Sequence, residues 1–89
     1  MDTVTVVISG IIFDSYHSEP ISQAVIRLAN DNNSYEQTSD KNGNFKFEHI
    51  AAGKYQIYAR FLGYYTLQDS IKFESGEIVE LKIRLGYDW

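Results

Sequence analysis

The stretch AGKYQIYARF (residues 52–61) has the clearest structural pattern in the chain. Apolar or aromatic side chains occupy every second position, and mostly polar side chains lie between them. The first set is Tyr55, Ile57, Ala59 and Phe61, and the second is Lys54, Gln56, Tyr58 and Arg60. A period of two places alternate side chains on opposite faces of a β-strand. The stretch therefore predicts a strand at the centre of a sheet, with one face in a core.

The same alternation recurs in short segments that are separated by turn residues. Six further strands are predicted at residues 4–13, 24–29, 34–39, 44–48, 66–73 and 78–85. The segment 34–39 is mostly polar and is expected at a sheet edge. About seven short strands at this spacing favour an all-β fold, a seven-stranded antiparallel Greek-key β-sandwich. The 89 residues are expected to form a single domain, residues 1–89, with a core that spans about residues 4–85.

The parity of each strand also predicts which side chains fill the space between the sheets. The predicted core consists of Ile8, Ile12, Ala24, Ile26, Leu28, Phe45, Phe47, Tyr55, Ile57, Phe61, Ile71, Val79, Leu81 and Ile83. Gly10 and Ala24 are small at positions where sheets or loops are expected to approach closely.

The segment Asp40-Lys41-Asn42-Gly43-Asn44 is the clearest turn in the chain. An Asn-Gly pair readily takes the positive φ angles of a tight hairpin, so we expect segments 34–39 and 44–48 to form one. The same residues superficially resemble the start of a calcium loop. Its glycine comes too early, however, and the closing glutamate is missing, so the turn interpretation is preferred.

Composition and charge exclude several classes of protein. With 44% hydrophobic and 22% charged residues the chain is expected to fold, and its net charge of −4 repels phosphate backbones and anionic lipid surfaces. We therefore predict no nucleic-acid partner. No apolar run approaches the roughly 20 residues of a transmembrane helix, and no signal-peptide pattern is visible. The lack of cysteine excludes disulfides and thiolate metal sites.

The residues that could carry chemistry are few and scattered. His17 and His49 are the only histidines; they lie in different turn regions without metal-ligand spacing. No serine, histidine and aspartate occur in a nucleophile pattern. We therefore predict no catalytic residue, no metal site and no cofactor. Several aromatic residues remain as candidate contacts for sugars or proteins, although cross-strand packing is the simpler interpretation. They are Tyr16, Tyr35, Tyr58, Tyr64, Tyr65, Tyr87 and Trp89.

The order of several short elements resembles the carboxypeptidase regulatory-like domain, a transthyretin-like sandwich module. These elements are Ile8-Ser9-Gly10-Ile11-Ile12-Phe13-Asp14, Glu19-Pro20-Ile21-Ser22-Gln23-Ala24-Val25-Ile26, Thr38-Ser39-Asp40-Lys41-Asn42-Gly43-Asn44-Phe45, Ala52-Gly53-Lys54-Tyr55 and Gly63-Tyr64. Each is weak alone, but together they follow the family order over about residues 6–85.

The resemblance implies a structural module that is attached to a larger exported or cell-surface protein, such as a carboxypeptidase, an outer-membrane receptor or a surface protein of Bacteroidetes-type bacteria. Its expected partner is a neighbouring domain or another protein, and its expected location is extracytoplasmic. A carbohydrate- or small-ligand-binding sandwich is the alternative. Transthyretin-like hydroxyisourate hydrolases share the fold and use histidines, an arginine and a C-terminal Tyr-Arg-Gly-Ser motif. This chain ends Leu85-Gly86-Tyr87-Asp88-Trp89, which disfavours that activity.

Overall fold

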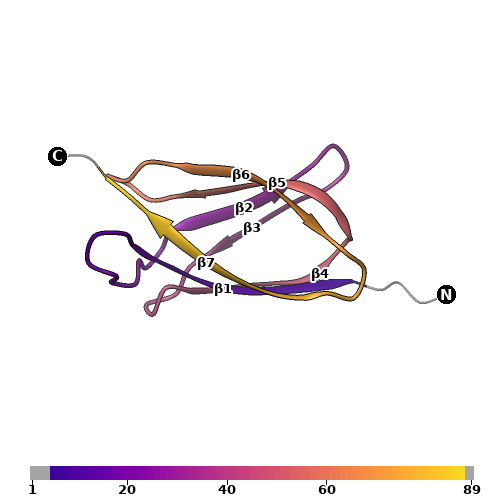
Figure 1. Ribbon diagram of the computed structural model, residues 1–89, viewed down its shortest axis with the longest axis horizontal. Helices are drawn as coiled ribbons and strands as arrows, with labels where there is room; N and C mark the ends of the chain where they lie inside the picture. The colour runs from indigo at the N-terminus through magenta and orange to yellow at the C-terminus, as the bar shows by residue number, and fades with distance from the viewer. Residues whose placement is uncertain (1–4, 88–89) are drawn as a thin grey trace.

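The computed structural model describes residues 5–87 and contains no helix in that range. The strands are β1 (Val6–Asp14), β2 (Val25–Ala29), β3 (Ser34–Thr38), β4 (Asn44–Ile50), β5 (Gly53–Arg60), β6 (Leu67–Phe73) and β7 (Ile78–Leu85). They form a three-stranded sheet in the order β4-β1-β7 and a four-stranded sheet in the order β3-β2-β5-β6 (Figure 1). The predicted all-β sandwich is confirmed, and β5 lies inside its sheet as expected.

One strand pair differs from the antiparallel prediction. β1 and β7 run parallel, with Val7 opposite Ile78 and Asp14 opposite Leu85. The reason is topological: β6 belongs to the four-stranded sheet, so the chain crosses to the other sheet before β7 begins. Period-two alternation reports which face a side chain occupies but not the direction of the neighbouring strand.

The turn at residues 40–44 connects the two sheets and does not form the predicted hairpin. β3 pairs with β2, whereas β4 pairs with β1. Gly43 has the expected positive φ of 79°, and Asn42 does not share it. The Asp40 carboxylate closes the turn, because its Oδ1 accepts hydrogen bonds from the Asn42 and Asn44 amides at 2.8 and 2.9 Å. The positive φ of Gly43 is therefore confirmed, whereas the predicted hairpin is wrong, because the turn lies between two sheets.

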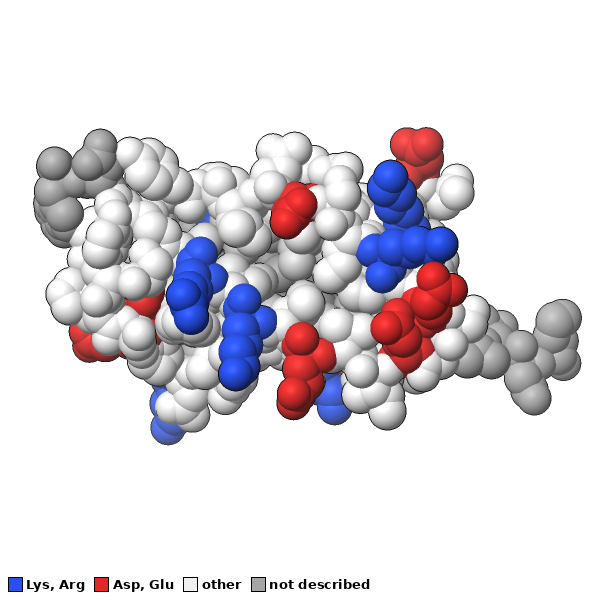
Figure 2. All heavy atoms as spheres, viewed as in Figure 1, with Lys and Arg blue, Asp and Glu red and all other residues white. Residues whose placement is uncertain are grey.

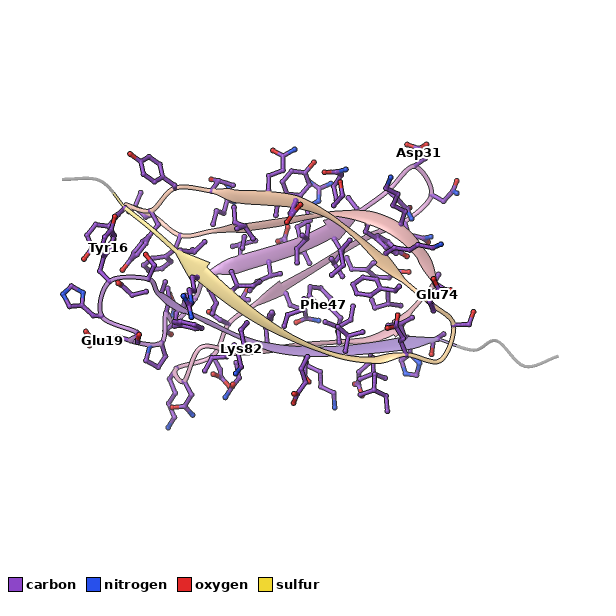
Figure 3. The ribbon with its side chains drawn as sticks, viewed as in Figure 1. Tyr16, Glu19, Asp31, Phe47, Glu74 and Lys82 are labelled. Atoms are coloured by element: carbon purple, nitrogen blue, oxygen red, sulfur yellow. The ribbon has the colours of Figure 1, made fainter. Side chains whose placement is uncertain are left out.

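The core contains most of the predicted side chains. Ten of them are buried: Ile8, Ile12, Ala24, Ile26, Leu28, Phe45, Phe47, Tyr55, Ile57 and Ile83. Phe47, for example, lies between the two sheets (Figure 3). Buried residues that the prediction omitted are Val6, Ile21, Ile50, Ala59, Phe73 and Leu85. Ile21 lies in a loop, where alternation gives no signal.

Four predicted core residues, Phe61, Ile71, Val79 and Leu81, are only partly buried and pack against the margin of the core. Ile71 belongs to β6, and Val79 and Leu81 belong to β7. Each of these strands is the edge of its sheet. An edge strand lacks a neighbour that would cover its inward side chains completely.

Figure 2 shows acidic and basic side chains spread over one side of the sandwich.

Ser39 is one of two buried polar or charged residues in the described part of the chain. Its hydroxyl donates to the Ile21 carbonyl at 2.6 Å and accepts from the Ala24 amide at 2.9 Å. These bonds attach the loop before β2 to the end of β3. They also explain how Ile21 is held in the core without being part of a strand.

We expect Ser39→Ala to lower the free energy of unfolding by about 1 to 3 kcal/mol, because a buried carbonyl and amide lose their partner. Urea denaturation measures this change. Ser75→Ala is the matched control, because Ser75 is exposed in the turn between β6 and β7. Equal urea midpoints for the two variants would contradict the prediction.

Candidate functional site

The two histidines lie at opposite ends of the sandwich. His17 follows the end of β1, whereas His49 is near the end of β4, which runs antiparallel to β1 and pairs Ile50 with Val6. The intervening length of β1 corresponds to about 25 Å. Within residues 5–87, no three histidine or acidic side chains are grouped so that they could hold a metal ion. The geometry therefore offers no shared site to this pair.

His17 instead belongs to a cluster at the end of the sandwich where Tyr16 and Glu19 lie (Figure 3). Asp14 is the centre of this end cluster. Its Oδ1 accepts the backbone amides of Tyr16 and His17 at 2.7 and 2.9 Å, and its Oδ2 accepts the Tyr64 hydroxyl at 2.7 Å. The Tyr87 ring contacts those of Tyr64 and Tyr16, with centroids 5.0 and 4.8 Å apart. The carboxylate thus joins the end of β1 to the loop that holds Tyr64, and the Tyr87 ring adds a third chain segment to the cluster.

The contacts of Asp14 hold its pKa below the ordinary value of 3.8. Burial acts to raise the pKa, but the hydrogen bonds from Tyr64, His17 and Tyr16 favour the ionised form and outweigh it. The hydrogen bond with Asp14, together with burial, raises the pKa of Tyr64 to about 12. Both pKa shifts arise from hydrogen bonds that the domain makes within itself. The Asp14 carboxylate therefore has a structural role.

Removing the tyrosine hydroxyl should make the domain more sensitive to acid. A lowered folded-state pKa stabilises the fold above the ordinary value, and this contribution is lost as the pH falls through the folded pKa. In Tyr64→Phe the pKa of Asp14 rises, so we expect acid unfolding to begin at higher pH and the Tm at neutral pH to fall by roughly 5 to 10 °C.

Tyr65→Phe is the matched control, since it removes the same atom from the neighbouring tyrosine, which is 61% exposed. Circular dichroism as a function of pH follows both variants. A Tyr64→Phe acid transition that coincides with that of Tyr65→Phe would contradict the role of the bond.

The structure assigns different environments to the candidate aromatic residues. Tyr35 and Tyr64 are half-buried and pack against the core. The ring centroids of Tyr35 and the buried Tyr55 are 6.0 Å apart. Burial is the main cause that raises the pKa of the Tyr55 hydroxyl to about 12. Tyr16 and Tyr65 are 63% and 61% exposed, but the Tyr16 ring already contacts that of Tyr87 at an interplanar angle of 56°. Trp89 lies outside the described residues. Tyr58 remains as a half-buried ring on an outward sheet face.

A groove crosses the outer face of the four-stranded sheet around Tyr58. This sheet groove has a volume of about 360 Å³ and is lined by Val25, Arg27, Ala29, Glu36, Tyr58, Arg60 and Thr66. A second hollow, of about 480 Å³, shares Val25, Arg60 and Thr66 with it and extends to the loop at residues 61–64. The two hollows adjoin each other at these shared residues.

The sheet groove brings together two arginines. Arg27 on β2 lies opposite Tyr58 on β5, and Arg60 is two residues farther along β5 on the same face. The Nε of Arg27 donates to the Ser34 hydroxyl at 3.3 Å. Glu36 lies across from Arg27 on β3. Among residues 5–87, no carboxylate lies within ion-pair distance of either guanidinium, so both retain donors for an external group.

Arg27 and Arg60 were not among the predicted site residues, although alternation with the predicted core residues Ile26, Leu28 and Ile57 places both on outward faces. The signal was incomplete, because alternation shows that each points outward without showing that β2 and β5 are neighbours. Pairing of these strands creates the site.

The comparisons agree with the architecture. A sequence model of the carboxypeptidase regulatory-like domain matches residues 7–86. The chain belongs to this family. No curated protein matches the sequence of this carboxypeptidase regulatory-like domain.

Solved structures share its fold at low sequence identity. A candidate carbohydrate-binding protein from Bacteroides uniformis has 12% identity and a TM-score of 0.75, over 92% of this chain and 41% of that one. The major pilin subunit of Bacillus cereus has 21% identity and a TM-score of 0.75, over 92% and 30%. The 5-hydroxyisourate hydrolase of Klebsiella pneumoniae has 15% identity and a TM-score of 0.72, over 93% and 92%.

These similarities establish a transthyretin-like sandwich, as the resemblance implied. The domain spans less than half of the Bacteroides and Bacillus proteins. Among the described residues, no helix is long and apolar enough to cross a membrane.

Proposed function

We propose that this domain is a non-catalytic accessory module of an exported or cell-surface protein, and that it acts through contacts with a neighbouring domain or a protein partner. One observation carries the proposal: the groups that could perform chemistry are separated or already engaged. His17 and His49 lie at opposite ends of β1, and Asp14 accepts three hydrogen bonds from its own chain. Catalysis needs such groups within reach of one another.

The outer face of the three-stranded sheet supports a role in contacts. Val7, Ile11 and Phe13 lie on the outward side of β1, with Ser9 between the first two, and are only half-buried. Ile78, which pairs with Val7, is 83% exposed. An apolar row of this kind can be covered by an adjacent domain. The extracytoplasmic location rests on the family and on the pilin and candidate carbohydrate-binding neighbours.

Pairing of a partner's strand with edge strand β6 or β7 is disfavoured as the mode of contact. Asp69 on edge strand β6 pairs with inward-facing Ile57 and yet is exposed, which places a charge on the core side of that edge. Edge strand β7 carries exposed Glu80 and Lys82. Charges at such positions block pairing with another strand. Contact through a sheet face is therefore the preferred mode.

The proposal is tested by assaying the purified chain for hydroxyisourate hydrolysis and for bound metal. We expect no turnover above the spontaneous rate and no stoichiometric metal. The His17→Ala and His49→Ala variants provide the comparison. Turnover that either substitution abolishes would overturn the non-catalytic assignment.

Carbohydrate binding is a second candidate, favoured by the sheet groove. Tyr58 offers an aromatic surface next to hydrogen-bonding side chains, a combination suited to sugars. The similarity to the candidate carbohydrate-binding protein of Bacteroides uniformis adds support from the fold.

A further inference from the structure

We propose that the sheet groove binds an acidic polysaccharide whose sugars carry carboxylates, and that Arg27 and Arg60 bind these carboxylates. This inference rests on the carbohydrate-binding candidate above and specifies its ligand class. Three observations support it: the distribution of charge, the positions of the two arginines, and the paired backbone of the strands under the groove.

Charge is distributed unevenly over the domain. The strand registers place four cationic side chains and one carboxylate on the outer face of the four-stranded sheet, namely Arg27, Lys54, Arg60 and Lys72 against Glu36. The whole chain has a net charge of −4. Of these cations, Lys72 has an acidic neighbour, Glu74, at 3.5 Å. The two arginines at the groove are therefore local cations on a protein whose overall field is negative, which favours a ligand with closely spaced anions.

The arginines are arranged for carboxylates. They occupy a diagonal position across β2 and β5, where side-chain origins are about 7 to 8 Å apart. A guanidinium can form two parallel hydrogen bonds with one carboxylate. Tyr58 lies opposite Arg27 and adjacent to Arg60 along its strand. One sugar ring on the tyrosine would place carboxylates of the same chain within reach of both cations.

The backbone groups at the groove are already paired, which favours a glycan over an acidic peptide as the ligand. β2 and β5 each have a neighbour on both sides, so their backbone groups are already used in the sheet. A peptide would find no free strand edge at the groove. The surrounding outward side chains include Ser34, Thr38, Gln56, Gln68 and Ser70, all of which exchange hydrogen bonds with hydroxyl groups. This polar surface suits sugars better than the apolar anchors of a peptide.

Other polyanions fit less well. Single-stranded nucleic acids need several aromatic platforms, and this groove has one. Membrane docking needs exposed apolar side chains beside the cations. Among the described residues, the large exposed hydrophobic side chains are Tyr16, Leu62, Tyr65 and Ile78. Of these, Leu62 lies beside Arg60 in the second hollow, and one apolar side chain is too little for a membrane-docking face.

The test is calorimetric titration of the full chain with trigalacturonic acid and with the neutral galactose trisaccharide. We expect the acidic trisaccharide to bind at least about tenfold more tightly than the neutral one. Its affinity should fall as salt is added. Arg60→Gln and Arg27→Gln should each reduce its affinity by about tenfold or more. Arg27→Lys should also weaken binding, because a lysine cannot make the paired hydrogen bonds.

Arg84→Gln is the matched control, because it removes one charge from the other sheet and should leave affinity unchanged. Melting temperatures verify that each variant is folded. Equal affinity for the neutral sugar would overturn the acidic ligand class while retaining carbohydrate binding. Equal affinity for hexaglutamate would overturn the glycan assignment. Loss of binding in Arg84→Gln would overturn the site, and no binding of either sugar would reject both carbohydrate proposals but not the accessory-module proposal.

Discussion

Gly43→Val is expected to lower the free energy of unfolding by about 3 kcal/mol or more. Two effects add at this position. Gly43 has φ 79°, a conformation that a β-branched residue resists. A Cβ atom there would also lie 2.5 Å from the Ile12 carbonyl oxygen and 3.0 Å from the Pro20 Cβ. The Ile12 oxygen cannot retreat freely, because it accepts the Ile21 amide at 3.0 Å.

Gly63→Val separates these two effects. Gly63 has φ 89°, but a Cβ atom added there meets no atom within 4 Å. It should therefore show the conformational cost alone, about 1 to 2 kcal/mol. Lys46→Val, at an exposed strand position, should change stability little. Urea midpoints compare the three variants, and a Gly43→Val midpoint no lower than that of Gly63→Val would contradict the contact argument.

Gly10→Val is expected to cost about 2 to 3 kcal/mol, because the ring of Phe45 occupies the space of its side chain. Gly10 and Phe45 are opposite each other on β1 and β4. An added Cβ would overlap the Cζ atom at the tip of the Phe45 ring. Phe45 is buried and packs edge-on against Phe47 at 6.1 Å, so the ring cannot move aside without disturbing the core.

A double-mutant cycle tests this explanation. Phe45→Leu shortens the side chain that covers Gly10, so Gly10→Val should cost less in that background than in the native chain. A coupling of at least about 1 kcal/mol is expected for residues in direct contact. Additive losses in the urea midpoint would show that the ring is not the obstacle.

Alternation along each strand was enough to predict the seven strands and most of the core. This succeeded because the side-chain face is a local property, set by a repeat of two residues. In β5, for example, Tyr55, Ile57 and Ala59 are buried and Lys54 and Arg60 are exposed. The positive φ of Gly43 was predictable for the same reason, since it depends on the Asn-Gly pair itself.

Tertiary structure alone decided which strands became neighbours. The parallel pairing of β1 with β7 and the separation of β3 from β4 arise from crossings between sheets, which no local pattern records. The bond between Asp14 and Tyr64 joins residues 50 positions apart. The sheet groove has the same origin. Alternation places Arg27, Tyr58 and Arg60 on outward faces, and Tyr58 and Arg60 share a strand, but only the pairing of β2 with β5 brings Arg27 beside them, because strand pairing is a long-range property of the whole fold.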